Sequence, residues 1–126
     1  MSSIECDQFI ARPPAAVWRA LTEPELLAKW WVAGDIKPVV GHRFTLDMGN
    51  WGNQVCEVLE VEEETLLRHT FAEGVLDTTI TWRLVPEGSG TRLFLTHDGF
   101  EPGSEALIGM GSGWPRLVAR IVVAIP

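Results

Sequence analysis

Between Asp35 and Asp98, apolar side chains occupy every second position of several short segments. The inward positions of four such segments are Phe44, Leu46 and Met48; Leu67, His69 and Phe71; Ile80, Trp82 and Leu84; and Leu93, Leu95 and His97. Because successive side chains of a strand point to opposite faces, this pattern is typical of strands with one face against a core. Short polar or glycine-rich stretches separate the segments, as hairpins between consecutive strands require. The middle of the chain therefore predicts an antiparallel sheet.

The spacing of apolar residues becomes helical before this region. Pro13 and Pro14 suit the first turn of a helix, where a missing N–H group costs nothing. Thr22 and Glu25 predict a second start, with Thr22 as the N-cap and Glu25 completing a capping box. Two short helices are therefore expected over about residues 13–31, after a first strand over residues 4–11.

A last helix is expected after Ser104, which is placed to cap it. Pro115 removes one internal hydrogen bond and should kink this helix or restart it. The glycines within residues 109–113 leave two alternatives open. The segment is either partly unwound or mobile, or the helix starts late, near Ser112 and Pro115.

The predicted sheet needs a cover for its apolar face, and the amphipathic C-terminal segment is the large candidate. A sheet that curves around this helix leaves a pocket wherever side chains do not fill the space between them. The fold class is therefore α+β, and the length of 126 residues suits one domain over residues 1–126.

Charge and composition narrow the classes of partner. Ten basic and seventeen acidic residues give a formal net charge of −7, which argues against nucleic acid and against an anionic membrane surface. No apolar run approaches the roughly 18 residues of a membrane span, and the N-terminal residues lack the features of a signal peptide. Cys6 and Cys56 have no close-spaced partner and are expected to be reduced. We therefore expect a cytoplasmic protein.

Four stretches carry a resemblance to a known family: Ile-Ala-Arg-Pro-Pro at residues 10–14 with Val17 and Trp18, residues 20–27 with Trp30 and Trp31, residues 90–97, and Gly113 with Trp114. Over nearly its whole length the chain is similar to the START-like (SRPBCC) superfamily, and within it to the activator of heat-shock-protein-90 ATPase homologue family. The resemblance implies a helix-grip fold, in which a curved antiparallel sheet of six to seven strands surrounds a C-terminal helix over a hydrophobic cavity. The family takes its name from a domain of a eukaryotic co-chaperone, which implies a link to the stress response. START-like relatives bind lipids, polyketides or hormones, or cyclise polyketides.

The candidate ligand-binding residues are aromatic, apolar or imidazole side chains on the predicted inner face, on the Gly-rich bend or on the helices. They are Trp31, Phe44, Leu46, Met48, Trp51, His69, Phe71, Ile80, Trp82, Leu95, His97, Met110 and Trp114. His69 and His97 come from different strands, and an imidazole near neutrality can bind a ligand or transfer a proton. No HExxH, CxxC or GxSxG motif occurs, so no metal, cofactor or catalytic residue is assigned.

The leading hypothesis is binding of a small apolar or aromatic ligand in the cavity. One alternative is a polyketide-cyclase-like or hydrolase-like enzyme that uses a pocket histidine. Another is a co-chaperone-like interaction module, which would expose an apolar patch instead of enclosing a cavity. The sequence favours a binding role over an enzyme, and it leaves a homodimer and a chaperone partner open.

Overall fold

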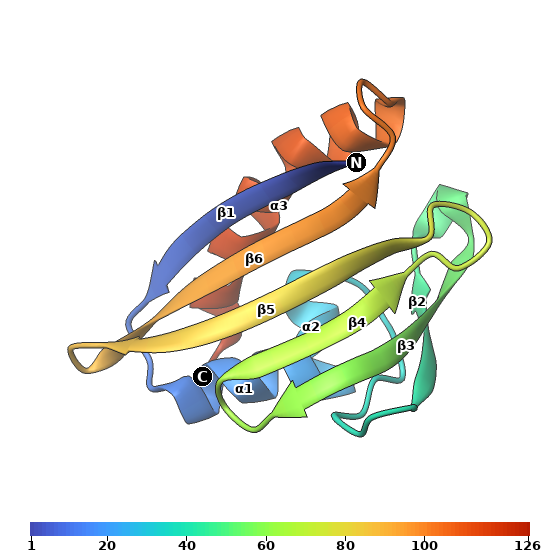
Figure 1. Cartoon of the computed structure of the whole chain (residues 1–126). Coiled ribbons are helices and arrows are strands. Elements are labelled where there is room, and N and C mark those ends of the chain that lie inside the picture. Colours follow the sequence, from blue (N-terminus) through green and yellow to red (C-terminus); the bar gives the residue numbers. More distant parts are fainter.

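The computed structural model describes residues 1–126 and contains one six-stranded antiparallel sheet in the order β1-β6-β5-β4-β3-β2. Its strands are β1 (Ser2–Ile10), β2 (Arg43–Asp47), β3 (Asn53–Glu62), β4 (Leu66–Phe71), β5 (Thr78–Glu87) and β6 (Gly90–Phe100). Figure 1 shows the sheet curving from β1 at one edge to the short β2 at the other. The expected helix-grip α+β fold is confirmed, with six strands in the sheet and five of them after the first two helices.

The two-residue alternation places matching side chains in rows across the sheet. His69, Ile80, His97 and Ile4 are in register across β4, β5, β6 and β1, and all four are buried. The neighbouring row on the same face contains Trp82. The inward direction of the strand residues is therefore as the alternation predicts.

Two short helices follow β1, α1 (Pro14–Thr22) and α2 (Pro24–Trp30). The expected Thr22 N-cap is wrong, because Thr22 is the last residue of α1 and its hydroxyl donates to the carbonyl oxygen of Trp18 at 2.8 Å. The break falls at Glu23, whose backbone is extended with φ −101° and ψ 123°. A residue before proline disfavours the helical conformation, so Pro24 decides where α1 ends.

The C-terminal helix α3 spans Glu105–Ala124 and begins directly after Ser104. The Ser104 Oγ accepts a hydrogen bond from the N–H of Leu107 at 3.2 Å, so the predicted cap is confirmed. The alternative of a late start near Ser112 is wrong, because the segment with three glycines is already helical.

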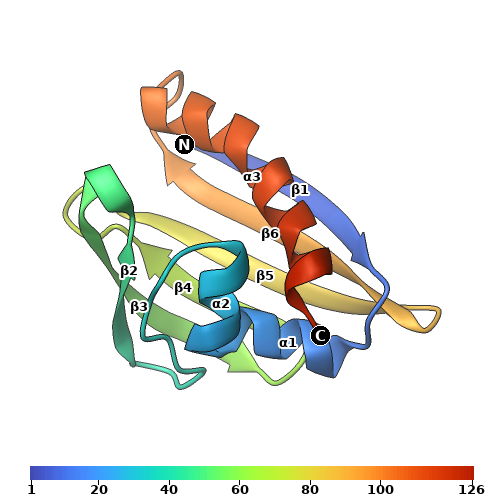
Figure 2. The ribbon, with the colours of Figure 1, turned by 180° about the vertical axis from the view of Figure 1, so that it is seen from behind.

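The helix α3 continues through Pro115, so the expected restart is wrong, and the alternative of a kink stays a prediction (Figure 2). Trp114, Val118 and Ile121 are buried on both sides of the proline turn. Burying such side chains is worth more than the one hydrogen bond that a proline removes, so packing keeps the helix continuous.

All three helices lie on the concave face of the sheet (Figure 2). The helix α3 packs along β1 and against α2, and the core lies between this helical layer and the sheet. None of the helices combines the length and the hydrophobicity that crossing a bilayer requires.

Candidate functional site

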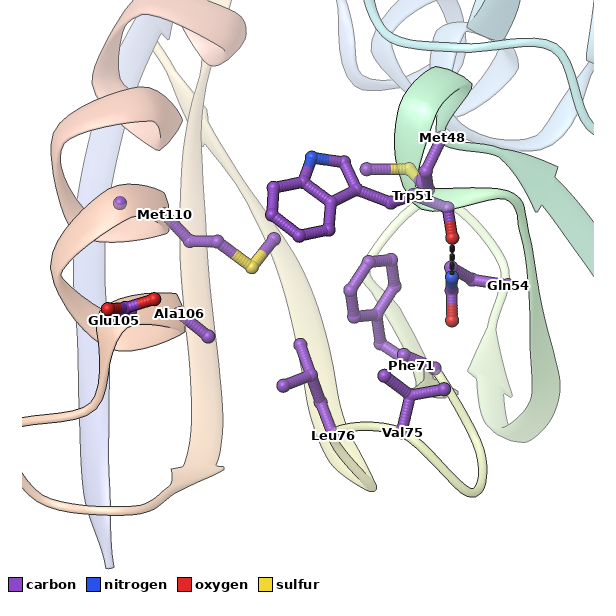
Figure 3. A pocket seen from close by; sticks show the side chains of 11 residues that line it. Met48, Trp51, Gln54, Phe71, Val75, Leu76, Glu105, Ala106 and Met110 are labelled. Carbon is purple, nitrogen blue, oxygen red and sulfur yellow. Dashed lines mark hydrogen bonds between the residues drawn. The ribbon is translucent and has the colours of Figure 1, made fainter.

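A pocket of about 540 Å³ opens at the end of the sheet where α3 begins. Its walls are the short helix η1 (Gly49–Trp51) with its flanks, the loop between β4 and β5, and the first turns of α3. Eight of its eleven lining residues are hydrophobic, and the full set is Met48, Trp51, Gln54, Phe71, Ala72, Val75, Leu76, Glu105, Ala106, Gly109 and Met110. In Figure 3 the Trp51 indole extends from η1 toward Met110 of α3, and Phe71 and Leu76 lie below them.

The first wall is a tight bend that presents Trp51. Gly49 and Gly52 have φ angles of 63° and 80°, which glycine adopts without the cost that a Cβ would bring. The Asp47 Oδ1 accepts from the N–H of Gly49 at 3.0 Å, and the Gln54 Nε2 donates to the carbonyl oxygen of Trp51 at 2.7 Å. The backbone of the bend is therefore held in place although the Trp51 side chain is 82% exposed.

The second wall is the β4–β5 loop, which folds around one carbonyl group. The Ala72 oxygen accepts from the N–H groups of Val75, Leu76 and Asp77 at 2.9 to 3.1 Å. The Asp77 Oδ1 in turn accepts from the N–H of Gly74 at 2.8 Å. Val75 and Leu76 are thereby fixed at the pocket by backbone bonds of their own loop.

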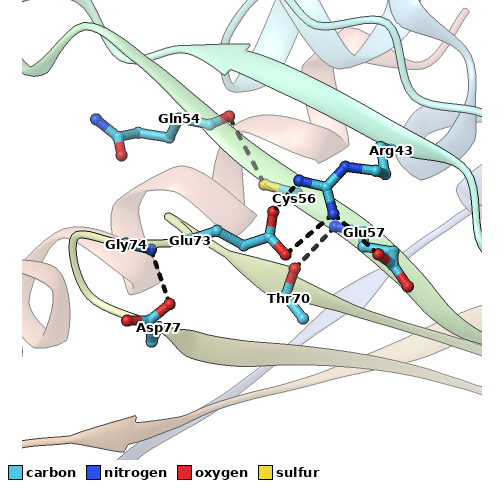
Figure 4. Close-up of polar contacts among 8 residues, drawn as sticks. All are labelled: Arg43, Gln54, Cys56, Glu57, Thr70, Glu73, Gly74 and Asp77. Atoms are coloured by element: carbon cyan, nitrogen blue, oxygen red, sulfur yellow. Dashed lines mark hydrogen bonds and ion pairs between the residues drawn. The ribbon is translucent and has the colours of Figure 1, made fainter.

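Arg43 ties this loop to the sheet from the outside (Figure 4). Its Nη2 lies 2.6 Å from the Glu73 Oε2, and its Nη1 lies 3.1 Å from the Glu57 Oε1. The Glu73 N–H also donates to the Val55 carbonyl oxygen of β3 at 3.0 Å. Exposed ion pairs each contribute little to the free energy of unfolding. We therefore assign Arg43, Glu57 and Glu73 a local role, which is to position the β4–β5 loop against the sheet.

Behind the pocket, aromatic rings fill the interior. Trp31 lies with its ring centroid 5.0 Å from that of Trp114, and Trp82 lies 5.7 Å from Trp30 and 5.6 Å from Trp114. None of these four tryptophans lines the pocket. Phe71, which does, stacks on Trp31 at 6.1 Å and so joins the pocket to the aromatic cluster.

His97 is held by partners on two other elements. The Trp114 Nε1–H donates to the His97 Nδ1 at 3.0 Å, and an indole N–H can only donate. The proton of the imidazole therefore resides on Nε2, which donates to the Thr78 Oγ1 at 2.8 Å. The Thr78 hydroxyl in turn donates a hydrogen bond to the carbonyl oxygen of Phe71 at 3.3 Å.

His69 has the opposite tautomer for the same reason. The Trp82 Nε1–H donates to the His69 Nε2 at 3.2 Å, so the Nδ1–H donates to the carbonyl oxygen of Thr70 at 2.8 Å. Burial lowers the pKa of His69 to about 4, and burial together with the charge of His69 lowers the pKa of His97 to about 3. Both imidazoles are neutral at pH 7, and all four ring nitrogens are occupied by structural partners.

The cysteines are free thiols outside the pocket. Burial raises the pKa of Cys56 to about 12, and burial with the nearby charge of Asp7 raises that of Cys6. Both thiols are therefore protonated at pH 7, which makes them weak nucleophiles. No three His, Cys, Asp or Glu side chains are grouped so that they could hold a metal ion.

The structure divides the thirteen candidate residues into two groups. Four of them line the pocket: Met48, Trp51, Phe71 and Met110. The others lie outside its lining, with Trp31 half-buried and the remainder fully in the core: Phe44, Leu46, His69, Ile80, Trp82, Leu95, His97 and Trp114. Alternation indicates that a side chain points inward, but it does not indicate whether the space in front of it is empty.

Seven lining residues were not among the candidates, namely Gln54, Ala72, Val75, Leu76, Glu105, Ala106 and Gly109. Most belong to a loop or to the first turns of α3, where no alternation marks an inward side. Gln54 carried a usable signal, because it shares the inner face of β3 with Cys56 and Val58 and is a polar residue there.

The profile of the family described as Activator of Hsp90 ATPase homolog 1-like protein matches residues 11–125. The chain belongs to this family. The resemblance inferred from the sequence is confirmed, and this family has the START-like architecture described above. No curated protein matches the chain at a significant level.

Solved structures of other proteins share this fold. Protein MLL2253 from Mesorhizobium loti is 33% identical with a TM-score of 0.88, and the match covers 98% of this chain and 96% of that one. Protein BH1534 from Bacillus halodurans is 27% identical with a TM-score of 0.87, and the match covers 100% of this chain and 98% of that one. The Aha1 dimer from Colwellia psychrerythraea shares the fold, with a TM-score of 0.87 and 20% identity. This match covers 99% of this chain and 96% of that one.

Proposed function

We propose that this chain binds a small hydrophobic ligand in the pocket between the curved sheet and the start of α3. One observation carries the proposal: a pocket of about 540 Å³ with eight hydrophobic residues among eleven. Sites for small molecules have this size and this predominantly apolar lining. We treat residues 1–126 as one domain, since the sheet and all three helices contribute to one hydrophobic core.

The exposed side chains at the pocket mouth supply a driving force for binding. Trp51 is 82% exposed and Val75 is 69% exposed, and a bound molecule would cover both. Each Å² of apolar surface removed from water is worth roughly 25 cal/mol, and the flat indole favours an aromatic partner. We assign Met48, Trp51, Phe71 and Met110 to direct contact with the ligand, and the core candidates to supporting Phe71 from behind.

Binding fits the geometry better than the enzymatic alternative. An acid–base role for His69 or His97 needs a ring nitrogen within reach of the substrate. Neither histidine lines the pocket, and each ring nitrogen already has a protein partner. The Colwellia relative is described as a dimer, but the proposed pocket is complete within one chain.

Two glycines of α3 provide a matched test. A Cβ added at Gly109 or at Gly113 would meet nothing within 4 Å, so a side chain can leave the helix at either position without a clash at its Cβ. Gly109 lines the pocket, and Gly113, one turn further along, does not. The Gly109→Leu side chain should fill the pocket, whereas Gly113→Leu adds the same side chain outside it.

The experiment is a titration with the neutral fluorescent probe N-phenyl-1-naphthylamine, after native mass spectrometry of the purified protein for a retained molecule. We expect saturable fluorescence enhancement with the unmodified protein and with Gly113→Leu, and at least about tenfold weaker binding with Gly109→Leu. Circular dichroism checks that both variants fold. An unmodified protein that gives no saturable signal, or equal binding by the two variants, would overturn the proposal.

A further inference from the structure

The charged side chains at the pocket are all acidic. Glu105 is the single charged residue among the eleven that line it, and no Lys, Arg or His takes part. An adjoining cavity of about 390 Å³ shares three lining residues with it and adds Asp77 and Glu101. Apart from Met1, whose amino group can be charged, this second cavity has no basic residue.

Gln54, which lines the same pocket, supplies a hydrogen-bond acceptor. Its side chain belongs to a residue that is 8% exposed, and its Nε2 donates to the Trp51 carbonyl oxygen at 2.7 Å. Because that partner can only accept, the amide orientation is set, and the Gln54 Oε1 is the end without a protein donor. No fully buried side-chain oxygen lacks a partner, so this Oε1 stays accessible. A ligand N–H or O–H could be accepted there.

The aromatic lining and the overall charge act in the same direction. The faces of Trp51 and Phe71 attract cations, and the formal net charge of −7 favours their approach. Arg43 cannot neutralise an anion in the pocket, since it does not line the pocket and is bound by Glu57 and Glu73. A buried carboxylate or phosphate would therefore find no counter-charge.

We infer that the ligand is an aromatic molecule that bears a protonated amine, with the ring system between Trp51 and Phe71, a donor on the Gln54 Oε1 and the cation near Glu105. This inference rests on the proposed function and specifies the class of ligand for that site. It rejects fatty acids and other anionic amphiphiles as ligands.

A series of ligands with one naphthyl body tests the charge preference. 2-Naphthylmethylamine, 2-naphthalenemethanol and 2-naphthylacetic acid are compared by displacement of N-phenyl-1-naphthylamine at pH 7. We expect the amine to bind about tenfold tighter than the acid, with the alcohol between them. Glu105→Gln should reduce the ratio of amine to acid affinity by about threefold, and it should weaken binding of the amine more than binding of the alcohol.

Glu25→Gln is the matched control, because Glu25 is an exposed carboxylate in the first turn of α2 and lies outside the pocket. It removes the same charge from the first turn of another helix and should leave the ratio of amine to acid affinity intact. An equal reduction in both variants would mean that net charge alone sets the preference, and would overturn the assignment to Glu105.

A fourth ligand tests Gln54. 2-(Methoxymethyl)naphthalene lacks the O–H of the alcohol and should bind about fivefold more weakly to the unmodified protein. In Gln54→Met the two should bind equally, and if this variant does not fold, the comparison in the unmodified protein still decides. If the alcohol and the ether bind the unmodified protein equally, the role of Gln54 is overturned.

The outcomes separate the two proposals. If the acid binds as tightly as the amine while the probe still binds and Gly109→Leu still blocks it, the ligand class is wrong and the binding function stands. If neither the probe nor any naphthyl ligand binds the unmodified protein, both the binding function and the ligand class are refuted.

Discussion

Lowering the pH from 7 to 5 should destabilise this protein through its two buried histidines. The pKa values of His69 and His97 are about 4 and about 3 in the folded chain, against 6.5 for the ordinary side chain. Below pH 6.5 the unfolded chain binds protons that the folded chain excludes, so the free energy of unfolding falls as the pH falls. The stabilising contribution is fully present above pH 6.5 and is lost progressively toward the folded pKa values.

Integrating this proton uptake between pH 7 and pH 5 gives about 2 kcal/mol for each histidine, or about 4 kcal/mol for the pair. Domains of this size have total stabilities of roughly 5–15 kcal/mol, so the loss is a large share. The range stops at pH 5 because most carboxyl groups stay ionised in both states down to that value.

The assay is urea unfolding followed by tryptophan fluorescence at pH 7, 6 and 5. His97→Gln removes one of the two histidines, so the free energy of unfolding should decrease by only about 2 kcal/mol between pH 7 and pH 5. His42→Gln is the matched control, because His42 lies at a loop outside the buried pair, and its fall should match the unmodified protein. The reasoning would be refuted if the free energy of unfolding of the unmodified protein decreased by less than about 1 kcal/mol between pH 7 and pH 5. It would also be refuted if His97→Gln showed the same decrease as the unmodified protein.

Four further substitutions test stability, each measured by urea or thermal unfolding. Trp114→Phe should cost about 1–3 kcal/mol, because His97 Nδ1 loses its donor in a buried site; a neutral result would contradict the assigned tautomer. Ser104→Ala should cost about 1 kcal/mol by removing the cap of α3, and an unchanged melting temperature would argue against that cap. Gly109→Ala should stabilise by up to about 1 kcal/mol, since its Cβ meets open space within a helix. Gly90→Ala should destabilise by more than about 1 kcal/mol, because its Cβ would lie 2.6 Å from a backbone oxygen of β1; equal gains in the two glycine variants would be inconsistent with this geometry.

The strands and the start of α3 could be predicted because their causes are local. Alternation over a few residues sets which side of the sheet a side chain faces, and Ser104 caps α3 through a residue three positions away. Together with the stretches that resemble the family, these patterns determined the helix-grip architecture.

Local sequence rules gave wrong helix boundaries at two places where other constraints of the chain opposed them. Pro115 and the glycines before it predicted an interrupted helix, yet Trp114 and Val118 pack on either side and hold α3 together. Thr22 has the chemistry of an N-cap, but the restriction that Pro24 places on Glu23 assigned it to the end of α1 instead.

The site depended on distances that no local pattern contains. His97 and Met110 were both candidate ligand-binding residues, but His97 is buried among aromatic rings and Met110 lines the pocket. The sequence by itself determined which side chains turn toward the interior, because that follows from the period of each element. The tertiary structure decided which of them fill the interior and which line the pocket, because that depends on how close the facing layer comes. It also set the histidine tautomers, since Trp82 and Trp114 reach those rings from other elements of the fold.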